Sequence, residues 1–343
     1  MLHVLARVIG LVILIGCGHV ADQTPKDGDI RDAPDILDAA EHSDAAIVYE
    51  GRHYGYVVSK IALPLTQAQV REYSLDLGSA NSSMLDGVAD NAIGVLLGLL
   101  AQENLPMQRV ITEAVDRGNI IQLLDLQSTD FINANNAGLR IRFGQNPVPQ
   151  PCNNAFDTIC RRHLTGSAIF SIAADSPTNA IFSGSVVNGE FDGFSSEITL
   201  QLAFANVTLI NLRLRHARIM ARSISENDIA TINIGGKVTK EETLITVVPV
   251  IQGQLKDILD RDCVAGGNGG VPPRCGCQSR SSGEALFRIF DGSVAGIPRD
   301  CQISSAEILT FAFYDSCSKA TCETPDALSV GLRLEAIKAT FPM

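Results

Sequence analysis

The chain has 343 residues, of which 45% are hydrophobic and 5% aromatic, and its formal net charge is −11. Nucleic acid is excluded as an expected partner, because phosphate backbones attract clustered lysine and arginine and this acidic chain has no basic stripe. The absence of tryptophan and the low aromatic content also weigh against carbohydrate binding by ring stacking.

The first seventeen residues have the pattern of a bacterial lipoprotein signal. Arg7 precedes an apolar run, Val8–Ile15, which ends in Leu14-Ile15-Gly16-Cys17. The run is too short to span a bilayer but fits a secretory signal peptide, which we expect to be removed as residues 1–16. The segment resembles the lipobox of exported lipoproteins, which implies a palmitate-type diacylglyceryl group on Cys17. The alternative is an ordinary secretory signal with an incidental cysteine.

Lipidation at Cys17 predicts a protein that is anchored to a lipid bilayer through acyl chains, because several chains exceed what stable membrane attachment requires. Gly18, and not aspartate, follows the cysteine. Under the rule familiar from enteric bacteria, this favours the outer membrane, with the protein facing the periplasm or the cell surface. Removal of residues 1–16 takes away one basic residue and no acidic one, so the mature net charge becomes −12.

Residues 17–46 are expected to form an acidic disordered tether behind the lipidated cysteine. Positions 21–46 hold eight acidic and two basic residues with few apolar ones. Repelling charges and a lack of apolar surface leave nothing to offset the entropy of ordering. An amphipathic helix around Ile36 and Leu37 is the alternative.

The folded region is expected to begin near Ile47. Apolar periodicity and turn residues predict the following elements in its first part: a strand at Tyr54–Leu63, a helix from Asp86 to about residue 103, a helix at Pro106–Arg117, and strands at Ile120–Leu126 and Leu139–Phe143. A loop rich in proline and asparagine follows these elements.

Residues 165–238 are the most strand-like part of the chain. In Val207–Ile219, apolar Ile210, Leu212 and Leu214 alternate with polar residues, which predicts one face toward a core and one toward water. Turn signals stand at Asn188-Gly189, Asp192-Gly193 and Gly235-Gly236. The pattern predicts an antiparallel meander.

The last part is predicted to contain a helix at Glu241–Leu259, a strand at Ala285–Phe290, a helix at Ser304–Phe313 and a strand at Leu328–Phe341. The expected fold class is therefore α+β and β-rich, with an antiparallel meander sheet, a few packed helices and disulfide-stapled loops. Residues 47–343 form either one domain or two closely packed subdomains divided near residue 150.

Nine cysteines are present: Cys17, Cys152, Cys160, Cys263, Cys275, Cys277, Cys301, Cys317 and Cys322. Lipidation takes one, and an even remainder of eight in an exported chain predicts a disulfide framework. Eight cysteines allow 105 connectivities. Loop closure favours Cys152 with Cys160 and Cys317 with Cys322, which leaves Cys263 and Cys301 to pair with Cys275 and Cys277.

No readable catalytic motif is present, and we expect a protein that is not an enzyme. The chain lacks the GxSxG serine elbow and the HExxH zinc-protease pattern. The histidines of the folded region, His53, His163 and His216, each stand near arginine, and we expect them to be solvated or hydrogen-bonded. An enzyme of unrecognised type is an alternative.

One fragment, residues 300–307, resembles the end of an EF-hand calcium loop. Asp300, Ser304 and Glu307 would then supply oxygen ligands. The fragment departs from the pattern because Cys301 stands where the turn glycine belongs and the first two acidic ligands are missing. The competing interpretation is a helix start in which Ser304 and Glu307 form a capping box. A weaker calcium-like fragment lies at Asp86–Asn91.

Three segments together resemble a group of uncharacterised predicted lipoproteins of myxobacteria and related bacteria. They are Leu85-Asp86-Gly87 with Asp90-Asn91-Ala92-Ile93-Gly94, then Cys160-Arg161-Arg162-His163-Leu164-Thr165-Gly166, and Asp326-Ala327-Leu328-Ser329-Val330-Gly331. The group has no assigned activity, so the resemblance implies kinship and not function.

The sequence thus predicts a membrane-anchored extracytoplasmic lipoprotein with a binding or structural role and no cofactor. Its expected partners are the bilayer, through Cys17, and an unidentified protein or small apolar ligand. Three alternatives stay open: a carrier of an apolar ligand or lipid held against the helix at residues 86–103, a weak calcium-binding envelope protein, and the enzyme named above.

Overall fold

The computed structural model describes residues 49–343 except 79–88, 103–105, 155, 205–207, 265–271, 273–274, 295, 311–313 and 318–323. The predicted signal peptide, Cys17 and the tether lie outside the described residues, as do Leu85-Asp86-Gly87 and Cys322. Residues 48–343 form one compact unit.

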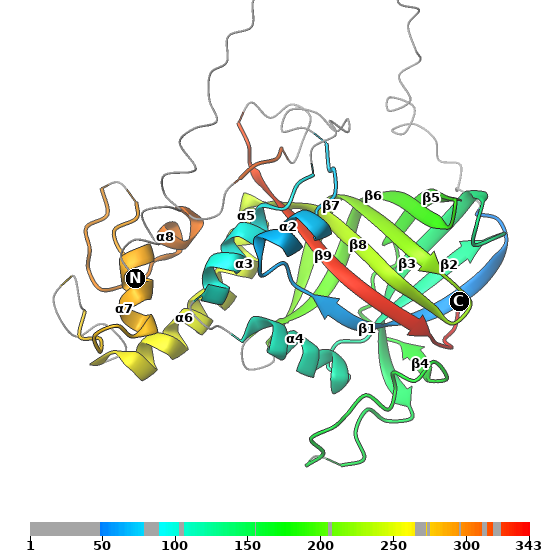
Figure 1. Cartoon of the computed structure of the whole chain (residues 1–343), viewed down its shortest axis with the longest axis horizontal. Helices are drawn as coiled ribbons and strands as arrows, with labels where there is room; N and C mark the ends of the chain where they lie inside the picture. The colour runs from blue at the N-terminus through cyan, green and yellow to red at the C-terminus, as the bar shows by residue number, and fades with distance from the viewer. Residues whose placement is uncertain are drawn as a thin grey trace, which may run out of the picture. The chain divides into compact units, whose positions relative to one another are not determined.

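An antiparallel sheet of eight strands closes on itself to form a barrel (Figure 1). The strands are β1 (Arg52–Ala62), β2 (Gln122–Ser128), β3 (Ala134–Val148), β5 (Ile181–Val187), β6 (Glu190–Phe204), β7 (Thr208–Ile224), β8 (Asp228–Thr239) and β9 (Ala327–Lys338). Their order is β2-β1-β9-β8-β7-β6-β5-β3, and β2 also pairs with β3. A short strand, β4 (Ile169–Ile172), pairs with β3 outside the ring. The predicted β-rich class is confirmed, but the predicted meander is a segment of a closed barrel and not an open sheet.

The barrel interior is filled by apolar side chains from opposite walls. Tyr56 on β1 and Leu200 on β6 belong to one buried cluster, although these strands stand opposite each other in the ring. Eight strands enclose just enough space for side chains to fill. The alternation predicted for residues 207–219 is confirmed, since Leu212 and Leu214 are buried while Arg213 is exposed.

Strand β7 changes the face that it presents to the core at His216. Leu214 and Ala217 are both buried in the interior although three positions separate them. His216 has a φ of 46°, and the pairing of β7 with β8 shifts register at this point. This bulge bends the longest hairpin of the barrel.

Only one of the three predicted turns is a turn. Asn188 and Gly189, with φ values of 53° and 81°, join β5 to β6 in the conformation that tight hairpins favour. Gly193 lies within β6 and Gly235-Gly236 within β8, so those two predictions are wrong. A Cβ at Gly235 would stand 2.5 Å from the Val330 carbonyl oxygen, which shows that close approach of neighbouring strands, and not a turn, requires glycine there.

Helices lie outside the barrel wall and at its end. They are α2 (Gln67–Tyr73), α3 (Ala92–Gln102), α4 (Met107–Asp116), α5 (Lys240–Glu242), the π-helix η3 (Thr243–Val247), α6 (Val248–Asp262), α7 (Ser282–Phe290) and α8 (Ser305–Thr310). Helix α4 contacts both β1 and β6 and therefore crosses one end of the barrel. None of the helices in the described part of the chain is long and apolar enough to cross a membrane.

Helix α7 replaces the strand predicted at Ala285–Phe290. Ser281 accepts a hydrogen bond from the Glu284 backbone N–H at 3.2 Å, which caps the first turn. The buried residues Leu286 and Phe290 are four positions apart on one helix face. The Ser281-x-x-Glu284 spacing is the sequence signal that this prediction missed.

Three disulfides join six of the described cysteines. They are Cys152–Cys160, Cys263–Cys277 and Cys275–Cys301. The first is the bond predicted from loop closure, and the other two join the four cysteines whose exact pairing the sequence left open. Cys317 is also disulfide-bonded. Every cysteine that the structure describes is therefore oxidised.

Candidate functional site

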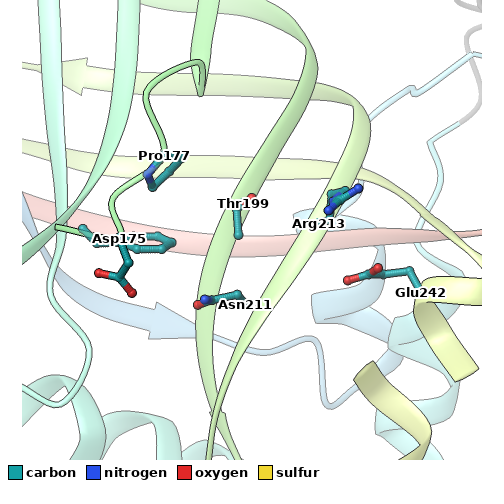
Figure 2. A pocket seen from close by; sticks show the side chains of 7 residues that line it. Asp175, Pro177, Thr199, Asn211, Arg213 and Glu242 are labelled. Carbon is teal, nitrogen blue, oxygen red and sulfur yellow. The ribbon is translucent and has the colours of Figure 1, made fainter. Parts of the chain in front are cut away.

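One polar hollow among the described residues is a groove of about 260 Å³ on the outer wall of the barrel (Figure 2). We call it the polar groove. It is lined by Phe143, Asp175, Pro177, Thr199, Asn211, Arg213 and Glu242. These residues come from β3, β6 and β7, from the loop that follows β4, and from α5.

The polar groove exists because β5 begins at Ile181 and leaves the last part of β3 without a β5 residue beside it. Strand β5 pairs with β3 only as far as Ile181 opposite Arg140, so β3 continues beyond its neighbour. The loop after β4 lies along this uncovered part of β3. Its Ala173 N–H donates to the Phe143 carbonyl at 2.8 Å, and the Phe143 N–H donates to Ser176 Oγ at 2.9 Å. These bonds hold Asp175 and Pro177 beside the wall formed by β6 and β7 (Figure 2).

The polar groove brings charges of both signs together. Arg213 projects from β7 toward the side of the groove on which Glu242 lies (Figure 2). Arg213 Nε is also 3.7 Å from a carboxylate oxygen of Glu197. The described lining contains neither histidine nor cysteine, and its side chains offer hydrogen bonding and charge pairing.

Asp300, Ser304 and Glu307 are not arranged as a set of free oxygen ligands. The Glu307 carboxylate accepts hydrogen bonds from the Gly292 N–H at 2.6 Å, the Ser304 N–H at 2.8 Å and Ser304 Oγ at 2.9 Å. Ser304 Oγ in turn accepts from the Glu307 N–H at 3.3 Å. This is the capping box of α8. Asp300 instead accepts from the Gln302 N–H at 3.0 Å, so a cation would have to displace backbone donors to use these carboxylates.

A buried carboxyl, Asp291, lies beside the Cys275–Cys301 disulfide. It accepts hydrogen bonds from the backbone N–H groups of Asp300 at 3.0 Å and Cys301 at 3.2 Å. Burial raises the pKa of Asp291, and the nearby charge of Glu307 raises it further. Cys275, Asp291 and Cys301 are close enough to share a metal ion. Both sulfurs are joined to each other, however, and a disulfide offers no thiolate ligand.

The three histidines of the folded region differ in their surroundings. His53 Nδ1 is 2.8 Å from the buried carboxylate of Asp125, as expected for a hydrogen-bonded histidine. His216 is exposed at the bulge of β7. His163 is fully buried, and neither ring nitrogen makes a hydrogen bond of ordinary geometry with the described residues. Burial lowers the pKa of His163 to about 4, with a smaller lowering from the Arg161 charge and an opposing effect of the Val115 carbonyl. The prediction that His163 is solvated or hydrogen-bonded is therefore wrong.

Two of the three segments that carry the lipoprotein resemblance meet at the start of α3. The Asn91 side chain donates to the Gly331 carbonyl at 3.1 Å and accepts from the Gly331 N–H at 3.0 Å. Ser329 Oγ accepts from the Ala92 N–H at 2.7 Å, and Asp315 binds Ser329 through both carboxylate oxygens. These hydrogen bonds satisfy backbone groups at the start of α3 and in β9. The residues therefore have a structural role, which is to hold α3 against the barrel.

Replacing Gly331 by alanine is expected to destabilise the protein by about 2–3 kcal/mol. The new Cβ would stand 2.7 Å from the Tyr73 carbonyl oxygen, which is backbone, and 2.9 Å from Asn91 Nδ2, which is held by its hydrogen bond to the Gly331 carbonyl. Denaturant unfolding measures the change. Gly253→Ala is the matched control, because a Cβ there meets nothing within 4 Å and alanine favours the helix. Equal stability of Gly331→Ala and the unaltered protein would contradict the close packing at this joint.

Comparison with known proteins identifies no relative: no family model, no curated protein and no solved structure matches the chain.

Proposed function

We propose that this chain is an envelope lipoprotein, anchored to a membrane through an acylated Cys17, whose disulfide-containing barrel acts as a rigid binding or scaffold domain without catalysis. The observation that carries the proposal is the state of the cysteines. All seven that lie in the described residues are disulfide-bonded. Such bonds persist in extracytoplasmic compartments and are rare in a reducing cytosol, which agrees with the exported leader expected from residues 1–17.

The filled interior of the barrel favours binding at the outer surface over carriage of a ligand inside. The apolar space between α3 and the barrel end measures about 20 Å³, and its lining, which includes Leu96, Leu202 and Leu332, is part of the main core. A pocket for a small molecule is usually roughly 300 Å³ or more. The polar groove, at about 260 Å³, is larger than the apolar space beside α3, and its charges of both signs suit a polar ligand such as a peptide segment.

Incorporation of radiolabelled palmitate tests the anchor. The unaltered chain, expressed in a bacterium that processes lipoproteins, is expected to take up the label and to fractionate with membranes. Cys17→Ser is expected to lose the label completely, because no other sulfur is available at the lipobox. Cys152→Ser is the matched control and should retain the label. A label that persists in Cys17→Ser, or that never enters the unaltered chain, would overturn the proposal.

A further inference from the structure

The loop closed by the Cys152–Cys160 disulfide presents two large apolar side chains to solvent. Phe156 is 92% exposed and Ile159 is 82% exposed, the highest values among the large hydrophobic residues of the described part of the chain. Figure 1 shows the segment that precedes β4 extending away from the barrel. We call residues 152–154 and 156–160 the apolar tip. Exposing such side chains is unfavourable in water, so their clustering marks a contact surface.

Internal hydrogen bonds and the disulfide fix the shape of the apolar tip. The Asp157 carboxylate accepts from the Asn153 N–H at 2.5 Å and from Asn154 Nδ2 at 3.0 Å. The Asn154 side chain in turn accepts from the Phe156 N–H at 2.8 Å. Phe156 is therefore held outward by the backbone of a closed loop, which reduces the entropy lost on binding.

The two strands that flank the apolar tip in the chain, β3 and β4, also expose apolar side chains. Val148 on β3 and Ile169 on β4 are direct cross-strand partners, and they are 61% and 55% exposed. On the inner side of this region, β4 and the chain end cover the barrel wall with a second buried cluster that includes Phe170 and Phe341. Val148 and Ile169 are thus exposed to solvent, whereas the other face of this region is packed against the barrel.

One arginine contacts the apolar tip, and two more follow it directly in the chain. Arg117, Arg161 and Arg162 are all exposed. Arg117 donates to the Asp157 carbonyl at 3.3 Å, which places its charge against the loop. Arg161 pairs with Asp116. Asp116 and Asp157 offset two of these three positive charges, so the rim keeps a net charge of +1 on a protein that is acidic overall.

From this geometry we infer that the apolar tip is a membrane-contact loop that inserts Phe156 and Ile159 into the surface of an anionic phospholipid bilayer. The guanidinium groups of the rim face the lipid phosphates, and the apolar side chains enter the boundary of the acyl chains. Charge complementarity selects the lipid surface. A second copy of the chain is a poorer fit, because two side chains bury far less than the roughly 800 Å² per partner of a stable interface. The inference deepens the proposed function by giving the barrel a defined orientation on its membrane.

The absence of tryptophan from the chain allows a direct test. In Phe156→Trp, the apolar tip carries the only indole of the protein. The test uses residues 18–343 without acyl groups, exported through an ordinary cleavable signal, so that every described residue is kept. On addition of phosphatidylglycerol vesicles, the emission is expected to shift to the blue and to be quenched by lipids brominated in the acyl chain. Ile245→Trp, on η3 at a site 63% exposed, is the matched control and should show neither effect.

Binding to the same vesicles is measured by co-sedimentation. Phe156→Ser is expected to weaken binding by about tenfold or more, because burial of a phenylalanine side chain supplies that much. Arg162→Gln is expected to weaken it by about fivefold and to reduce its dependence on salt. Both side chains are exposed, and an unchanged thermal midpoint checks that the variants fold.

Three results would overturn the inference. They are an emission unchanged by anionic vesicles, equal binding to neutral phosphatidylcholine vesicles, and a blue shift that appears without lipid as the protein concentration rises. The last result would assign the tip to self-association. The protein carries no acyl chain in this experiment, so a negative vesicle result does not bear on the lipidation of Cys17. Likewise, a negative palmitate result does not bear on binding of the apolar tip to vesicles.

Discussion

Replacing both Cys275 and Cys301 by alanine is expected to lower the free energy of unfolding by roughly 3–4 kcal/mol, since the disulfide closes a loop with a sequence separation of 26. Both residues are buried, and the bond joins the segment before α7 to the segment before α8. Loss of the bond frees the unfolded chain and leaves small cavities around the two alanines. Denaturant unfolding under oxidising conditions gives the difference directly.

The double variant Cys152→Ala with Cys160→Ala is the matched control. Its disulfide has a sequence separation of only 8, so the expected loss is smaller, roughly 2–3 kcal/mol. If the short loop proved to stabilise the protein more than the long one, the chain-entropy account of this framework would be wrong.

Lowering the pH from 6.5 to 4 is expected to remove about 3 kcal/mol of stability through His163 alone. The folded protein holds this histidine neutral, with its pKa lowered to about 4, whereas the unfolded chain binds a proton near pH 6.5. The stabilisation is therefore present above pH 6.5, is lost progressively as the pH falls through 4, and levels off once the pH is well below the folded pKa. Unfolding measured across this range reports the loss.

His163→Leu isolates that effect, because leucine keeps an apolar group in the buried site and cannot titrate. The variant should lose about 3 kcal/mol less than the unaltered protein over the same pH range. His53→Gln serves as the control, since His53 is partly exposed and paired with Asp125, and the loss through His163 should persist in it. A His163→Leu variant with the full pH dependence would show that other groups cause the acid sensitivity.

Local patterns predicted much of the secondary structure. The alternation in β6 and β7 and the broad apolar face of α3 are each contained in a short stretch of sequence. Closure of the barrel is not contained in a short stretch, because it depends on the pairing of β1 with β9, whose partners lie more than 200 positions apart in the chain. Gly235 and Gly236 were misinterpreted for the same reason: the neighbours that require glycine come from other strands.

The surface features were harder to predict. The polar groove depends on the late start of β5 and on a loop that fills the edge beside it, and neither leaves a motif. The burial of His163 and the exposure of Phe156 have no signature in the adjacent residues, since both depend on how the segment before β4 packs on the barrel. Disulfide pairing was predicted in part: local loop closure gave Cys152–Cys160, whereas the sequence left open which of Cys275 and Cys277 bonds to Cys263 and which to Cys301.

The most direct test of the central claim is the intact mass of the protein purified from the membrane fraction of its host, measured before and after alkylation of the denatured chain. The proposal predicts a chain that begins at residue 17, carries acyl groups at Cys17, and shows no alkylation unless it is first reduced, after which eight sulfurs react. A chain that retains residues 1–16, or that alkylates at eight cysteines without reduction, would contradict it.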